Sequence, residues 1–84
     1  MKPIKIYTFP MCPYCARAKS LLKKKGAAFE EIDVMMDPDA RQEMQASSGG
    51  ATTVPQIFIG DTHVGGCDDL QALERDGKLD ALLA

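Results

Sequence analysis

Two cysteines, Cys12 and Cys15, are separated by two residues and offer the clearest chemistry in this chain of 84 residues. Such a pair can cycle between a dithiol and a disulfide, or it can supply half of a four-ligand zinc site. A zinc site would draw its other ligands from His63 and Cys67, which form no second pair of this kind. Inert core cysteines are a third alternative, but Cys12 lies in a Pro-Met-Cys-Pro break, a poor place for burial. The pattern therefore favours redox chemistry.

The elements around the pair predict how the two sulfurs differ. Residues 4–9 alternate apolar and polar side chains, which predicts a strand, and residues 13–25 repeat apolar residues at steps of three and four, which predicts a helix. Cys12 then lies at the helix N-terminus, where free backbone N–H groups and the helix dipole stabilise a thiolate. Cys15 lies one turn further in and is less exposed. We therefore expect Cys12 to attack a disulfide and Cys15 to resolve the resulting mixed disulfide.

The remaining segments predict three more strands and two more helices. Asp37 is the expected N-cap of the second helix, and Gly60-Asp61 is the expected two-residue turn of a hairpin. The strand–helix–strand opening implies a parallel pair with a right-handed crossover. The fold class is therefore α/β, a small mixed four-stranded sheet with helices on both faces, in the order βαβαββα. The predicted strands are 29–34, 56–59 and 62–64, and the predicted helices run from 38 to about 46 and from about 68 to 83.

Length and charge exclude several classes of protein. The chain has room for one domain, over residues 1–84, and no apolar run approaches the ~18 residues of a membrane span. Three cysteines do not suit a disulfide scaffold, and the start lacks the apolar stretch of a secretory signal, so we expect a reducing cytoplasm. Seven of the ten basic residues lie in the first 25 positions, but no aromatic residues interleave them as in a nucleic-acid footprint. His63 stands alone on a predicted strand and is expected to be a surface or half-buried residue.

Three stretches together resemble the glutaredoxins, the glutathione-linked branch of the thioredoxin superfamily, and in particular their short bacterial dithiol type. They are Cys12-Pro13-Tyr14-Cys15, Thr53-Val54-Pro55 and Gly65-Gly66-Cys67-Asp68-Asp69. The resemblance extends from end to end and implies a thioredoxin-like fold. It also implies a glutathione-dependent thiol–disulfide oxidoreductase that reduces protein disulfides and glutathionylated proteins, with Cys12 and Cys15 as catalytic residues.

The resemblance also implies a glutathione site. Val54 would pair its backbone with the cysteinyl part of glutathione, in front of a cis peptide bond to Pro55. The N–H groups at the start of the last helix would bind the γ-glutamyl carboxylate. Asp68 and Asp69 could instead be only first-turn acids, and Cys67 is expected to act through its backbone. The implied glutathione-binding residues are Tyr14, Thr53, Val54, Pro55, Gly66, Cys67, Asp68 and Asp69, with Pro13 and Arg41 in support.

One position departs from the family pattern. Glutaredoxins often carry a lysine three residues before the first active-site cysteine, where this chain has Phe9. The positive charge would then come from the helix terminus or from Arg17, Lys19 or Arg41. Arg41 could also reach the glycyl carboxylate of glutathione, or it could be a solvated helix-face residue.

Partners follow from the same resemblance. Glutathione is the expected co-substrate, and disulfide-bonded or glutathionylated proteins, such as ribonucleotide reductase, are the expected targets. A monomer without metal, nucleic acid or membrane is expected. Two alternatives stay open: a glutaredoxin-like donor reduced by thioredoxin reductase, and an iron–sulfur cluster carrier that uses one thiolate and glutathione. Carriers usually have Gly-Phe-Ser after the cysteine, whereas this chain has Pro-Tyr-Cys.

Overall fold

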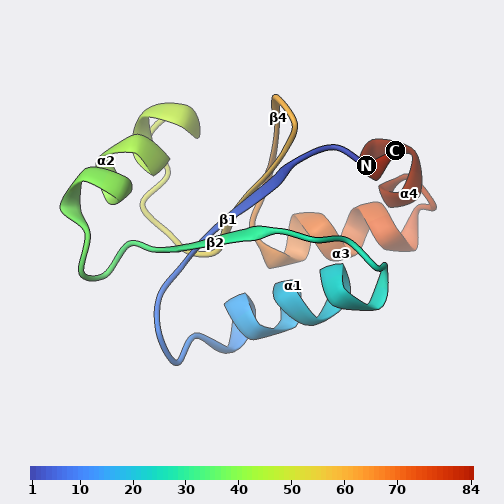
Figure 1. Ribbon diagram of the computed structural model, residues 1–84, viewed down its shortest axis with the longest axis horizontal. Coiled ribbons are helices and arrows are strands. Elements are labelled where there is room, and N and C mark those ends of the chain that lie inside the picture. Colours follow the sequence, from blue (N-terminus) through green and yellow to red (C-terminus); the bar gives the residue numbers. More distant parts are fainter.

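The computed structural model describes residues 1–84 and contains one mixed sheet with helices on both of its faces (Figure 1). The strands lie in the order β2-β1-β3-β4; β1 is parallel to β2 and antiparallel to β3, and β3 is antiparallel to β4. This arrangement confirms the predicted fold class. The elements are β1 (Ile4–Thr8), α1 (Pro13–Lys24), β2 (Glu30–Asp33), α2 (Pro38–Ser47), β3 (Gln56–Ile59), β4 (Thr62–Gly65), α3 (Cys67–Arg75) and α4 (Leu79–Leu83).

The alternation of β1 divides the core between the two faces of the sheet. Ile4 and Ile6 pack with the buried leucines of α1, α3 and α4, whereas Tyr7 packs with Val34 and with Ala40 and Met44 of α2. Figure 1 shows α1 and α3 together on one side and α2 on the other. Because successive strand side chains point to opposite faces, a single strand supplies both clusters.

The last predicted helix is divided in two, which corrects the expected order to βαβαββαα. After Arg75 the chain forms a Schellman motif: the Gly77 N–H donates to the Glu74 carbonyl at 3.1 Å, and the Lys78 N–H donates to the Leu73 carbonyl at 2.9 Å. Gly77 has a φ of 71°, in the left-handed region that favours glycine. The step from Leu73 to Leu79 is six residues and contains Gly77, so the apolar pattern breaks at this turn, and the sequence prediction passed over that break.

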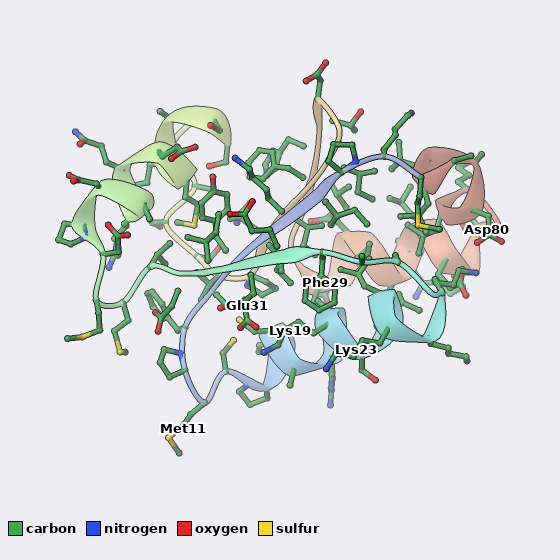
Figure 2. The ribbon with its side chains drawn as sticks, viewed as in Figure 1. Met11, Lys19, Lys23, Phe29, Glu31 and Asp80 are labelled. Carbon is green, nitrogen blue, oxygen red and sulfur yellow. The ribbon has the colours of Figure 1, made fainter.

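Two ion pairs fasten the end of α1 to the C-terminal helices. The Lys25 Nζ lies 2.8 Å from Glu74 Oε1 and 2.9 Å from Asp80 Oδ1. These carboxylates, Glu74 first, raise the pKa of Lys25. Figure 2 shows Asp80 on α4, at the same end of the molecule as the last turn of α1. The first turn of α1, where the two cysteines lie, is thus at the opposite end from this attachment.

No helix in the structure has the length and apolar character that crossing a membrane requires.

Candidate active site

Cys12 occupies the N-cap position of α1, as the sequence predicted. Its backbone is extended (φ −96, ψ 113), and its sulfur accepts a hydrogen bond from the Cys15 N–H at 3.2 Å. Pro13 follows at the first helical position, where a residue without an N–H leaves no donor unsatisfied. The Cys12 sulfur thus acts as the capping acceptor at the N-terminus of α1.

Cys15 lies directly inside Cys12 and is only 1% exposed. Burial and the hydrogen bond to Cys12 raise the pKa of Cys15 to about 12. Both residues are free thiols and are close together, as in a dithiol site. The environment therefore separates a partly exposed Cys12 from a buried Cys15 whose thiol stays protonated at neutral pH.

Met11 presents its side chain to solvent immediately before Cys12. It is 100% exposed and has a φ of 58, the left-handed region that residues other than glycine rarely adopt. Figure 2 shows it pointing away from the body of the molecule. The strained turn directs the chain from β1 into α1, and it leaves an apolar side chain on the rim of the site.

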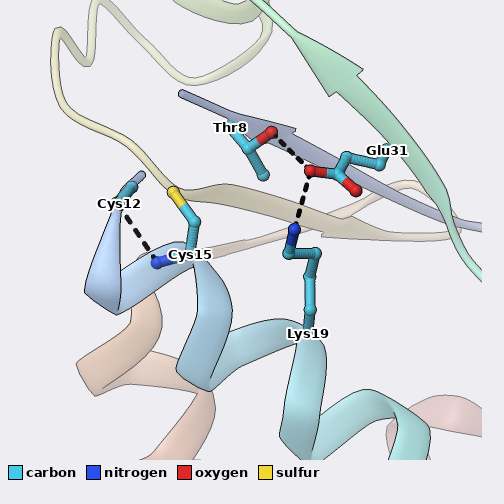
Figure 3. A network of polar contacts seen from close by, with 5 residues as sticks. All are labelled: Thr8, Cys12, Cys15, Lys19 and Glu31. Atoms are coloured by element: carbon cyan, nitrogen blue, oxygen red, sulfur yellow. Dashed lines mark hydrogen bonds and ion pairs between the residues drawn. The ribbon is translucent and has the colours of Figure 1, made fainter. Parts of the chain in front are cut away.

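A polar network lies beside the cysteines on the side of β2 (Figure 3). The Thr8 hydroxyl and the Lys19 ammonium both donate to Glu31 Oε2, each at 2.9 Å. The hydrogen bond from Lys19 is the main cause that lowers the pKa of Glu31. Cys12 and Cys15 line a depression together with Lys19 and Glu31, so an ion pair stands at the wall of the dithiol site.

A second depression, a groove of about 370 Å³, brings together all eight residues predicted to bind glutathione. These eight come from three segments distant in sequence: the first turn of α1, the loop before β3, and the start of α3. Tyr14 follows Pro13 in the chain, so the groove begins beside the dithiol site. The predicted residues that line it are Tyr14, Thr53, Val54, Pro55, Gly66, Cys67, Asp68 and Asp69.

The loop before β3 offers backbone groups to this groove. The Val54–Pro55 peptide bond is cis, as expected. Neither the N–H nor the C=O of Val54 takes part in a hydrogen bond within the protein. Unpaired backbone groups on a partly exposed residue are available to an extended peptide that binds as an added strand.

The start of α3 forms another wall of the groove. Asp69 Oδ2 accepts a hydrogen bond from the Gly66 N–H at 3.0 Å, so its carboxylate caps the helix. The alternative role for Asp69, a first-turn acid that serves the helix, is therefore present in the structure. Asp68 is exposed and has no such partner. The first N–H groups of a helix have no partners within the helix and can bind an anion.

Two arginines lie over aromatic rings near the cysteines. The Arg41 guanidinium lies 5.7 Å from the centre of the Phe9 ring, and that of Arg17 lies 6.0 Å from the centre of the Tyr14 ring. Arg41 does not line the groove. Its charge nevertheless stands above Phe9, the residue at the position where glutaredoxins often have lysine.

The sequence interpretation missed three residues that line the groove, Ala51, Gln56 and His63. His63 is exposed, as expected, but it stacks on Phe58 with ring centres 4.8 Å apart and contacts Gln56. The antiparallel pairing of Phe58 with His63 produces the stacking of their rings, and the predicted hairpin could have revealed this pairing. No three side chains of the His, Cys, Asp and Glu types gather closely enough to hold a metal ion.

Comparison with known proteins agrees with this geometry. A family model described as Glutaredoxin matches residues 4–64. A glutaredoxin of Pseudomonas aeruginosa is 62% identical over 84 residues, which cover 100% of this chain and 99% of the relative.

Solved structures give the same result and support the thioredoxin-like form of the sheet. The solution structure of a glutaredoxin from Brucella melitensis is 64% identical and has a TM-score of 0.85, with 99% of this chain and 89% of that chain covered. A crystal structure of a buckwheat glutaredoxin–glutathione complex is 34% identical with a TM-score of 0.86, and it covers 98% of this chain and 76% of that one.

Proposed function

Because this chain belongs to the glutaredoxin family of thiol–disulfide oxidoreductases, we propose that it uses glutathione to reduce protein disulfides and glutathionylated proteins. The observation that carries this proposal is the groove beside the dithiol site, whose lining includes unpaired Val54 backbone groups and the start of α3. A structurally similar buckwheat glutaredoxin forms a complex with glutathione, which supports the same ligand here.

The proposed reaction starts with the Cys12 thiolate. It attacks one sulfur of the substrate disulfide, a Cys12–substrate disulfide forms, and the other sulfur leaves as a thiolate that takes up a proton. Cys15 then loses its proton and attacks Cys12, which forms the Cys12–Cys15 disulfide and releases the second thiol. Two glutathione molecules supply the two electrons that restore both thiols, and they leave as glutathione disulfide. For a glutathionylated protein, glutathione can replace Cys15 in the second step.

Two walls of the groove would hold the tripeptide. In this proposal the Val54 N–H and C=O pair with its cysteinyl residue, and the N–H groups of Cys67 and Asp68 bind the γ-glutamyl carboxylate. Tyr14 and Thr53 flank the sulfur. Arg41 supplies positive charge over Phe9, in place of the lysine that other glutaredoxins have there.

We further propose that the chain acts as a monomeric single domain over residues 1–84 in a reducing cytoplasm. There the two thiols return to the reduced state between turnovers. Ribonucleotide reductase is a candidate target, as are glutathionylated enzymes.

The test couples reduction of a glutathionylated peptide to glutathione and glutathione reductase. We expect the Cys12→Ser protein to be inactive and the Cys15→Ser protein to keep deglutathionylating activity. Cys67→Ser is the matched control, because Cys67 is buried and its role is assigned to the backbone. Activity that survives Cys12→Ser would refute the assigned nucleophile. A parallel assay replaces glutathione and glutathione reductase with thioredoxin reductase. Turnover that only thioredoxin reductase supports would identify a glutaredoxin-like donor reduced by that enzyme.

A further inference from the structure

Three polar side chains form a continuous hydrogen-bonded chain along one wall of the groove. His63 Nε2 lies 2.7 Å from Gln56 Oε1, and Gln56 Nε2 lies 3.0 Å from the Thr53 carbonyl oxygen and 3.3 Å from Thr53 Oγ1. Gln56 is only 5% exposed. A buried amide relies on protein partners rather than on bulk water, so the contacts of Gln56 at both of its ends fix its orientation.

The chemistry of the partners sets the direction of each bond. The Thr53 carbonyl can only accept, so the amide nitrogen of Gln56 must face it and donate. The amide oxygen of Gln56 therefore faces His63, and because this oxygen can only accept, Nε2 of His63 carries the hydrogen. Donation runs in one direction, from His63 through Gln56 to Thr53.

The hydrogen-bonded chain of side chains ends on the peptide unit that joins Thr53 to Val54. The unit is planar, and it is trans, since the cis bond is the next one, between Val54 and Pro55. In a trans peptide the C=O of one residue and the N–H of the next point in opposite directions. When Gln56 holds the Thr53 carbonyl, the Val54 N–H is aimed away from Gln56, and it has no partner in the protein.

We infer that Gln56 and His63 are positioning residues that set the direction of the Val54 N–H toward the glutathione moiety of a substrate. The inference rests on the proposed function, in which this N–H binds the cysteinyl part of glutathione. Phe58 supports the chain, because the His63 ring stacks on it across β3 and β4 at an interplanar angle of 25°.

The stacking of His63 on Phe58 allows a variant to lose the hydrogen bond to Gln56 and still keep an aromatic ring at position 63. His63→Phe keeps an aromatic ring against Phe58 but has no donor, whereas His63→Gln restores an N–H donor for Gln56. Gln56→Met fills a similar volume and removes both amide donors without adding charge. The experiment measures KM and kcat for a glutathionylated peptide. It also measures the rate at which Cys12 reacts with an aromatic disulfide that lacks glutathione and does not use the groove.

We expect Gln56→Met to raise KM about tenfold and His63→Phe about threefold, the range that one lost hydrogen bond accounts for. His63→Gln should return KM to within about twofold of the wild-type value. All three variants should keep kcat and the reaction with the aromatic disulfide within about twofold, because the dithiol site is not altered. A residue that only stabilised the fold would lower the melting temperature without this selective change in KM.

The outcomes separate the inference from the function on which it rests. If the wild-type protein turns over the glutathionylated peptide and Gln56→Met and His63→Phe keep its KM, the inference is wrong. If the wild-type protein shows no glutathione-dependent turnover, the proposed function is wrong. The amide shifts of Val54 then decide the inference without substrate: unchanged shifts in both variants overturn it, and a shift that His63→Gln reverses supports it. If Gln56→Met fails to fold, the comparison of His63→Phe with His63→Gln gives the same decision, because His63 is exposed.

Discussion

Raising the pH should accelerate the step in which Cys15 resolves the mixed disulfide, because only a thiolate attacks. Burial first, and then the hydrogen bond to Cys12, raise the pKa of Cys15 from its usual 9.0 to about 12. Once the Cys12 sulfur is bound in a mixed disulfide, it no longer acts as a charged acceptor beside Cys15, but burial remains. The working pKa of Cys15 therefore lies between these two values.

The size of the effect follows from the two limits. At pH 7 a thiol with a pKa of 9 is ionised in about one molecule in 100, and a thiol with a pKa of 12 in about one in 100,000. In both limits the thiolate fraction rises about tenfold for each pH unit between pH 6 and pH 8. The logarithm of the resolving rate should therefore rise with pH at a slope of about 1.

An aromatic disulfide that releases coloured thionitrobenzoate separates the two steps. Attack by Cys12 releases the first equivalent, and attack by Cys15 releases the second, whose rate is followed by stopped flow from pH 6 to pH 8. Cys15→Ser should release only the first equivalent, whereas the Cys67→Ser control should release both. A second release whose rate does not change over this range would refute the reasoning, because Cys15 would then already be ionised at neutral pH.

Three further predictions concern the core, the wall of the groove and the polar network. Leu22→Ala, at a fully buried position of α1, should lower the free energy of unfolding by about 2–5 kcal/mol in denaturant titrations. Gly65→Ala should weaken binding of a glutathionylated peptide and lower the melting temperature, because its Cβ would overlap the Asp69 carboxylate that caps α3 and its φ is 112. A wild-type melting temperature would contradict this. Lys19→Met should raise the pKa of Glu31 toward its usual 4.5, measured by NMR titration of the carboxyl group. Since the folded pKa of Glu31 is lowered, Lys19 contributes stability above about pH 4.5 that is lost as the pH falls, and less than about 1 kcal/mol for this partly exposed pair.

Local patterns predicted the architecture of the sheet and the position of the dithiol pair. The alternation in β1, the apolar steps in α1 and the break before Pro13 each depend on residues close in sequence. Such signals settle which elements form and where Cys12 lies relative to its helix. The division of the last helix was missed, although the six-residue step from Leu73 to Leu79 and the glycine within it, Gly77, both interrupt the helical pattern.

The composition of the groove could not come from local patterns. Tyr14, Val54 and Asp68 are brought together only by the packing of α1, the loop before β3 and α3, and the family resemblance supplied their association before the structure did. For the same reason, local patterns could not predict the hydrogen bonds that connect His63 through Gln56 to Thr53. They depend on the pairing of β3 with β4, where the register shifts between Ile57 and Phe58, and on a buried glutamine whose partners lie on both sides of it.

The separate packing of α2 has a consequence for hydrogen exchange and for target proteins. This helix buries only Ala40 and Met44, against a small cluster on its own face of the sheet, whereas α1, α3 and α4 share the larger cluster. Segments with few buried apolar contacts open locally at lower free energy than the rest of a fold. The amides of α2 should therefore exchange with deuterium before those of α1 and α3. Because residues 48–53 connect α2 to Val54, a bulky protein substrate could displace this side of the groove while the helix that carries Cys12 stays in place.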